Sequence, residues 1–255
     1  MQIIVQLLLL LSAAYGVPGS FTPVGFGIPP HEGTVITRTE YCIIHDDHSK
    51  IPVFAAYVLT AAYLGGSAQR KNVFYPDPFL NPSRRAELAD YQKSGYDRGH
   101  LIPAGDMTRS AEAMYDTFTL ANIAPQLPSF NRGVWKRVEE WTRGYAVKRG
   151  KILIKTGAIL HTNRSEPAKC IGPGRVAVAP YFYKIILTEE KEKLQAVSFV
   201  FPHQASSAPL SEFLTNIDGI ELMSGLDFLN LLTEEMQAVI ERDLTWGESL
   251  FSGTE

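Results

Sequence analysis

The chain has 255 residues, 45% apolar and 20% charged, with a formal net charge of −3. This composition supports a sizeable core in one large or two small domains, and no internal repeat or low-complexity segment is present. Residues 66–155 hold fifteen Lys and Arg against nine Asp and Glu, whereas the rest holds nine against eighteen. A basic middle segment can steer a polyanion into one cleft, although uneven surface charge explains the pattern without a ligand.

The first sixteen residues have the pattern of a signal peptide. The stretch from Ile3 to Ala14 is nearly all apolar, and small residues suit cleavage after Gly16 or after Ala14. The run is too short for an ordinary membrane span, and its lack of Arg argues against a mitochondrial presequence. We expect a signal peptide at residues 1–16, a secreted or periplasmic protein, and no membrane attachment after signal removal. An uncleaved tail or anchor is the alternative, because no Lys or Arg precedes the apolar run.

The chain has two cysteines, Cys42 and Cys170. An oxidising compartment would favour one disulfide between them, which we expect in view of the signal-like segment. Two buried free thiols are the alternative. Two separated cysteines are too few for a tetrahedral zinc site built on Cys.

Hydrophobic patterning predicts strands and helices in unequal runs. In chain order we predict strands at 34–44 and 51–60, a helix at 83–91, an extended segment at 96–103, helices at 110–117 and from Asn131 to Ala146, strands at 151–160, 175–188 and 194–202, and helices at 211–223 and 233–244. Pro180 interrupts one strand, which indicates an edge or a bulge there. Since βαβ units do not alternate regularly, we predict an α+β fold with a mixed, mainly antiparallel sheet core and flanking helices. No linker divides residues 17–255, which we expect to form one domain.

The most informative segment is YDRGHL at residues 96–101, which places Asp97, Arg98 and His100 within four positions. A neutral imidazole can take a proton from an attacking water, and a guanidinium can hold a phosphate oxygen. Asn131, thirty-one positions after His100, offers an amide oxygen of the kind that Mg²⁺ accepts while keeping most of its waters. These residues together predict metal-assisted cleavage of a phosphodiester.

The motif resembles that of the DNA/RNA non-specific endonucleases, the ββα-metal nucleases with an Asp-Arg-Gly-His motif. The resemblance runs from about Gly25 to about Glu241 and includes NIAPQ at 122–126 and FNRGVW at 130–135. It implies a ββα-metal active-site motif, Mg²⁺ as cofactor with Mn²⁺ as the alternative, and DNA and RNA as substrates cut to 5′-phosphate ends. Because the family contains both monomers and dimers, a homodimer stays open.

The resemblance also implies roles around the scissile phosphate. His100 matches the general base, and Arg98 matches a clamp on a phosphate oxygen. Arg70 aligns with a second such arginine, with an ordinary surface arginine as the alternative. We expect Asp97 to orient the imidazole or to order the water shell of the metal. Gly99 is expected to permit a backbone turn that a side chain would block.

Two residues match the metal-binding part of the family motif. Asn131 is expected to be the direct metal ligand, and a helix cap is its alternative role. Glu139, eight residues further along the predicted helix, is expected to act through metal-bound water, with a solvated surface Glu as the alternative. Asn122 resembles a family residue that supports the site.

The function predicted from these observations is an exported, metal-dependent, sugar-non-specific endonuclease. One alternative is a catalytically inactive nuclease-like protein that binds nucleic acid or another partner. A phosphodiesterase acting on a smaller substrate is a further alternative, which the basic middle segment disfavours.

Overall fold

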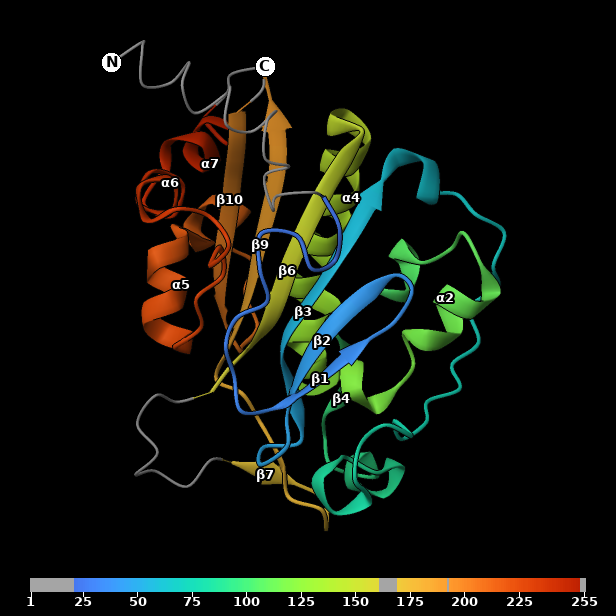
Figure 1. Ribbon diagram of the computed structural model, residues 1–255. Helices are drawn as coiled ribbons and strands as arrows, with labels where there is room; N and C mark the ends of the chain where they lie inside the picture. The colour runs from blue at the N-terminus through green and yellow to red at the C-terminus, as the bar shows by residue number, and fades with distance from the viewer. Residues whose placement is uncertain (1–20, 161–168, 192, 253–255) are drawn as a thin grey trace.

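The computed structural model describes residues 21–160, 169–191 and 193–252. The predicted signal peptide at 1–16 therefore lies outside the described residues. One antiparallel sheet with the strand order β1-β2-β3-β6-β9-β10-β11 forms the centre of the molecule (Figure 1). Its strands are β1 (Thr34–Thr37), β2 (Tyr41–Asp46), β3 (Ile51–Thr60), β6 (Lys151–Ile159), β9 (Tyr181–Glu190), β10 (Lys193–Pro202) and β11 (Leu214–Thr215).

The two faces of this sheet are covered by different helices. Along β6, Ile152 and Ile154 join the core beneath α4 (Lys136–Arg149), while Leu153 joins a second core beneath α5 (Ile217–Ser224) and α6 (Glu234–Ile240). This alternation follows from the two-residue period of a strand. In Figure 1, α4 passes behind the sheet and α5 and α6 lie to the left. The predicted α+β fold is confirmed.

A second sheet of two strands packs into the same core as α4, through residues such as Ile123 and Ala124. Its strand β4 (Asp97–His100) pairs antiparallel with β5 (Ile123–Gln126), which is followed by α3 (Pro128–Phe130), by a wide turn at Asn131–Trp135, and by α4. The remaining α-helices and strands of the described residues are α2 (Ala111–Asp116), β7 (Cys170–Ile171), β8 (Val176–Ala177) and α7 (Thr245–Ser249), and short 3₁₀ turns such as Ala104–Asp106 lie between the elements. The order β4-β5-α4 is the ββα arrangement that the resemblance implied.

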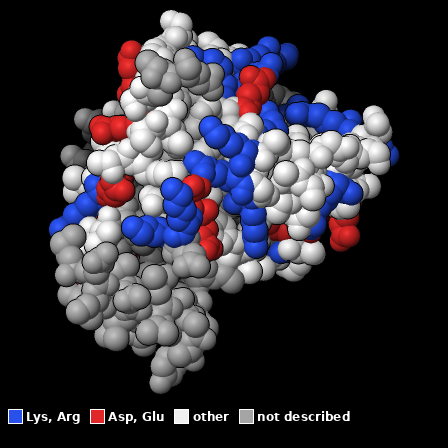
Figure 2. Space-filling model, turned by 90° about the horizontal axis from the view of Figure 1, so that it is seen from above, with Lys and Arg blue, Asp and Glu red and all other residues white. Residues whose placement is uncertain are grey.

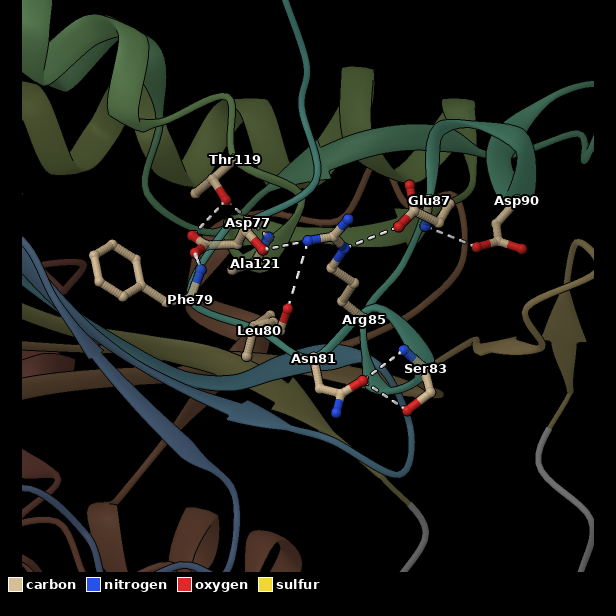
Figure 3. A network of polar contacts seen from close by, with 10 residues as sticks. All are labelled: Asp77, Phe79, Leu80, Asn81, Ser83, Arg85, Glu87, Asp90, Thr119 and Ala121. Carbon is tan, nitrogen blue, oxygen red and sulfur yellow. Dashed lines mark hydrogen bonds and ion pairs between the residues drawn. The ribbon is translucent and has the colours of Figure 1, made fainter.

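The connection between β3 and β4 is held by a polar network around the buried carboxylate of Asp77 (Figure 3). This carboxylate accepts hydrogen bonds from Thr119 Oγ1 at 2.7 Å and from the backbone N of Phe79 at 2.9 Å. Arg38 Nη2 also donates to it at 2.7 Å, and Arg85 Nη1 donates to the backbone O of Asp77 at 2.9 Å. The network fixes an irregular segment that buries polar groups, which would be costly without these partners.

Several predicted elements differ in the structure. The strand at 34–44 is two strands, β1 and β2, joined by a tight turn. The helix at 83–91 is replaced by two short 3₁₀ turns, Pro82–Arg84 and Leu88–Tyr91, and the helix at 211–223 begins only at Ile217. Asn216 caps that helix by accepting from the backbone N of Gly219 at 2.9 Å, which explains the later start.

The expected disulfide is wrong. Cys42 is buried in β2 of the central sheet, whereas Cys170 lies in β7, which pairs with β8 in a separate two-stranded sheet. No disulfide joins them in the described part of the chain. Burial raises the pKa of the Cys42 thiol, so this residue is a small apolar core group.

Across residues 21–160, 169–191 and 193–252, no helix combines the length and the hydropathy needed to cross a bilayer.

Candidate active site

Strand β4 presents Arg98 and His100 on one face and Asp97 and Gly99 on the other. Gly99 lies in extended pairing with β5, so the expected turn at this residue is wrong. The residue is nevertheless constrained, because a Cβ there would lie 2.2 Å from the side chain of buried Gln126. Glycine therefore allows the Gln126 side chain to pack directly against the backbone of the motif.

The imidazole of His100 lies in an aromatic pocket. Its ring centroid is 5.4 Å from that of Phe74 and 5.1 Å from that of Phe118. The residue is 9% exposed, and its Nε2 has no hydrogen-bond partner among the described residues. Burial, together with the charges of Arg70 and Arg98, lowers the pKa of His100 to about 3, so its imidazole is neutral at neutral pH.

The two arginines sit on the same aromatic rings that hold His100. The guanidinium of Arg98 lies 4.3 Å from the centroid of the Phe74 ring, and that of Arg70 lies 5.5 Å from the centroid of the Phe118 ring. Both side chains are exposed, and Nε of Arg70 donates to Asn72 Oδ1 at 2.9 Å. The structure thus brings Arg70 and Arg98 to the sides of His100, which leaves guanidinium donors free to hold an anion.

Asp97 has a different set of partners from the one expected. Its carboxylate does not contact the imidazole but accepts from Asn131 Nδ2 at 3.0 Å. Arg132 binds both carboxylate oxygens, at 2.8 Å through Nε and 2.7 Å through Nη2. These donors lower the pKa of Asp97 against the opposing effect of desolvation. Because Asp97 holds the amide nitrogen of Asn131, the amide oxygen is directed to the other side.

Asn131 lies inside a helical segment instead of at its start. The helix begins at Pro128, and Asn131 has helical angles of φ −57° and ψ −47°. From Asn131 to Trp135 the backbone widens into a π turn, with Gly133 at φ −103° and ψ −112°. These helical angles do not fit an N-cap at a helix start, the alternative role of Asn131. A π turn changes the direction of the residues beside it, and such turns are frequent at functional sites.

Glu139 is half-buried on α4, beside a network of charges that includes buried Asp106 and Lys184. Burial raises the pKa of its carboxyl, while the nearby cations Lys184, Arg143 and Arg70 lower it. The network continues to Asp106, which accepts from Arg143 Nη1 at 2.8 Å and also from Tyr57. The solvated-surface alternative for Glu139 does not fit this environment.

Arg132, Arg143 and Lys184 were missed by the sequence reasoning. Arg143 follows Glu139 by four residues, a helical spacing that could have revealed it. Lys184 is fully buried in β9, and its Nζ lies 4.9 Å from the Trp135 ring. The available signal was a single Lys within the apolar stretch 181–187. Because Lys is rarely buried without a charged partner, this position indicated a carboxylate nearby.

Asn122 holds the backbone that follows the motif. Its Oδ1 accepts from the backbone N of Ile102 at 3.0 Å, and its Nδ2 donates to the carbonyls of Ile102 at 3.0 Å and Thr117 at 2.9 Å. The indole of Trp135 donates to the carbonyl of His100 at 3.2 Å. Both side chains therefore fix the end of β4.

Positive charge at the surface is interleaved with negative charge. On the face seen from above, Lys and Arg side chains lie beside Asp and Glu (Figure 2). The excess of basic residues over 66–155 therefore does not form one uninterrupted basic surface on this face.

Comparisons with known proteins agree on one family. The model of the DNA/RNA non-specific endonuclease family matches residues 18–235. A mitochondrial nuclease 1 from Schizosaccharomyces pombe is 33% identical, with 80% of this chain and 69% of the relative covered. Nuclease C1 from Cunninghamella echinulata is 32% identical, with coverages of 84% and 90%. A chain in a crystal structure of the EndoG/EndoGI complex matches with a TM-score of 0.76 and 28% identity, covering 84% of this chain and 92% of that chain.

These relatives contradict the expected localisation. The Schizosaccharomyces nuclease and several further relatives have names that place them in mitochondria, not in a secreted or periplasmic location. The expectation rested on an apolar leader without Arg. Such a leader is an address read by a receptor, and its composition alone does not fix the compartment.

Proposed function

The chain belongs to the DNA/RNA non-specific endonuclease family, and we propose that one metal-dependent site around His100 and Asn131 carries its nuclease activity. The observation that supports this most directly is the hydrogen bond from Asn131 Nδ2 to Asp97 at 3.0 Å. It joins the DRGH strand, which carries the proposed base, to the helical segment that carries the proposed metal ligand, 34 positions further along the chain, and this supports a single site.

The residues present fit a hard divalent cation. Asn131 has its nitrogen engaged by Asp97, which leaves a neutral amide oxygen as a donor. Glu139 adds a carboxylate on the same helical segment. Oxygen donors of this kind suit Mg²⁺, or Mn²⁺ as the alternative, and a bound ion would neutralise charge on the scissile phosphate. Asp97 and Arg132 would then position the ligand.

The remaining chemistry follows from the protein side chains. His100 is neutral, so it can accept the proton of a water that attacks phosphorus. Arg98 and Arg70 would hold non-bridging phosphate oxygens and stabilise the charge that develops on them. The resulting ends would be 5′-phosphate and 3′-hydroxyl. Contacts of this type go to the phosphate backbone of the nucleic acid and carry no sequence information, in keeping with cleavage of both DNA and RNA.

We further propose that residues 17–255 form one nuclease domain, with DNA and RNA as its substrates. A homodimer is compatible with this proposal, and the mass of the purified protein in solution would test it.

The function is tested by incubating purified protein with plasmid DNA and with RNA, with and without EDTA. We expect both substrates to be cut, EDTA to stop cleavage, and a DNA ligase to reseal nicked plasmid, because the ligase requires 5′-phosphate ends. His100→Ala should slow cleavage by about 10² to 10⁴ while the variant still binds nucleic acid. Binding without cleavage by the wild type would favour the inactive nuclease-like alternative.

A further inference from the structure

A second group of oxygen donors lies on the opposite face of the sheet from α4. Asp218 and Glu221 are one helical turn apart on α5, and Glu241 follows the last residue of α6. One carboxylate oxygen from each of the three lies within 4.8 Å of the others. The backbone N of Asp218 also donates to the carbonyl of Glu241 at 3.1 Å, so the ends of the two helices are held together.

One oxygen of the Glu241 carboxyl is buried without a donor among the described residues, although the carboxyl also meets the backbone N of Leu229 and the carboxyl of Glu221. Glu241 is 5% exposed, and its Oε1 has no hydrogen-bond donor in the described part of the chain. By contrast, Oε1 of Glu221 accepts from the backbone N of Phe228 at 2.9 Å. An unsatisfied carboxylate oxygen in the interior is costly, and each such oxygen calls for an explanation such as an ion or a water.

The acidic groups around the cluster outnumber the basic groups, which favours binding of a cation. Asp227 is a fourth carboxylate close enough to interact with Glu221 and Glu241. Two cations face the group. Lys155 Nζ donates to the carbonyls of Gly27 and Phe228, and Arg242 Nε lies 3.3 Å from Asp218 Oδ2 in an exposed pair. When the four carboxyls are ionised, four negative groups against two basic ones leave net negative charge beside a buried oxygen. Burial and crowding raise the pKa of Glu241 to about 7, which a bound cation would reverse.

The number and kind of donors favour Ca²⁺ over Mg²⁺. Mg²⁺ usually keeps several waters and takes one or two carboxylates, whereas three carboxylates converge here, with one oxygen of each within 4.8 Å of the others. Ca²⁺ also accepts six to eight oxygens in irregular geometry, including carbonyls and waters.

We propose that Asp218, Glu221 and Glu241 form a Ca²⁺ site that is separate from the catalytic centre and ties the end of α6 to α5. These helices cover one core of the central sheet through residues such as Ile217 and Ile220. Binding of an ion only to the folded state would stabilise this cover by mass action.

Calorimetric titration of metal-free protein with CaCl₂ in the absence of nucleic acid tests the site. We would use Asn131→Ala as the background, so that binding at the catalytic centre does not contribute. The background protein should take up one Ca²⁺. Adding Glu241→Gln or Glu221→Gln should weaken binding by about tenfold or more, because the number of charged ligands tunes affinity. Mg²⁺ should compete poorly.

The matched control is Glu234→Gln, the same change at an exposed position of α6 outside the cluster. Thermal unfolding in EDTA checks the fold of each variant. In EDTA, neutralising one of several crowded carboxylates should not lower the melting temperature, because no bound Ca²⁺ is lost. Ca²⁺ should then raise the melting temperature of the background and the control but not that of Glu241→Gln. Absence of saturable Ca²⁺ uptake by the background, or equal uptake by all variants, would overturn the site and indicate carboxyls that share a proton.

Discussion

Replacement of Gly99 by Ala should disrupt the motif through one identifiable collision. The added Cβ would lie 2.2 Å from Cδ and Oε1 of Gln126 and 2.5 Å from its Cγ. Gln126 is fully buried, so its side chain has little room to withdraw, and β4 must shift by roughly 1 Å to restore normal contact. Overpacking of this kind costs about 1–3 kcal/mol of folding stability. A shift of that size beside His100 can reduce the cleavage rate by about 10².

The chain supplies a matched control and a rescue for this prediction. A Cβ added at Gly144, inside α4, would meet nothing within 4 Å beyond the backbone of its own helix, so Gly144→Ala should stabilise the protein by about 0.5–1 kcal/mol without loss of activity. Gln126→Ala removes the colliding atoms, so the double variant Gly99→Ala/Gln126→Ala should recover about 1 kcal/mol or more relative to additivity. Urea unfolding and initial cleavage rates measure both effects. Strict additivity of the two substitutions would refute the steric argument.

Two further substitutions probe the supports of the site. Asp97→Asn should reduce stability by less than about 1 kcal/mol near pH 7, because the pair with Arg132 is partly exposed. Because the pKa of Asp97 is depressed in the folded state, its contribution is present above the unfolded-state pKa of about 3.9 and is lost as the pH falls through the lower folded value. Urea unfolding at several pH values should therefore show the difference between variant and wild type shrinking below about pH 4. Asn122→Ala should cost about 2–4 kcal/mol, since it leaves the buried backbone groups of Ile102 and the carbonyl of Thr117 without partners, and a loss under about 1 kcal/mol in thermal or urea unfolding would contradict this.

The strands of the central sheet could be predicted because their residues are long apolar runs bounded by turns. The predicted strand at 194–202 differs from β10 by one residue at its start, and Pro180 does separate β8 from β9. The elements that differed lie where tertiary contacts decide the local structure. The segment at 83–91 forms 3₁₀ turns, because Arg85 and Asp90 are engaged by distant partners such as Asp77 and Gly174.

The expected catalytic residues do lie around one place, but the contacts between them could not be read from the chain. Motif spacing indicated Asp97 and Asn131 separately, and only the fold shows that they are hydrogen-bonded. The π turn at Asn131–Trp135 changes the relation between Asn131 and Glu139 that an ideal helix predicts. Lys184 was hidden because its neighbour in space, Trp135, is far away in sequence.

The most direct test of the central claim is the initial rate of plasmid cleavage as a function of Mg²⁺ concentration, measured for wild type and for Asn131→Ala. Asn131 is proposed to offer the metal its amide oxygen while Asp97 holds the amide nitrogen. The variant should therefore need at least about tenfold more Mg²⁺ to reach half of its maximal rate, since loss of a ligand weakens the site more than loss of an outer contact does. Identical Mg²⁺ dependence in the two proteins would contradict a metal site at Asn131.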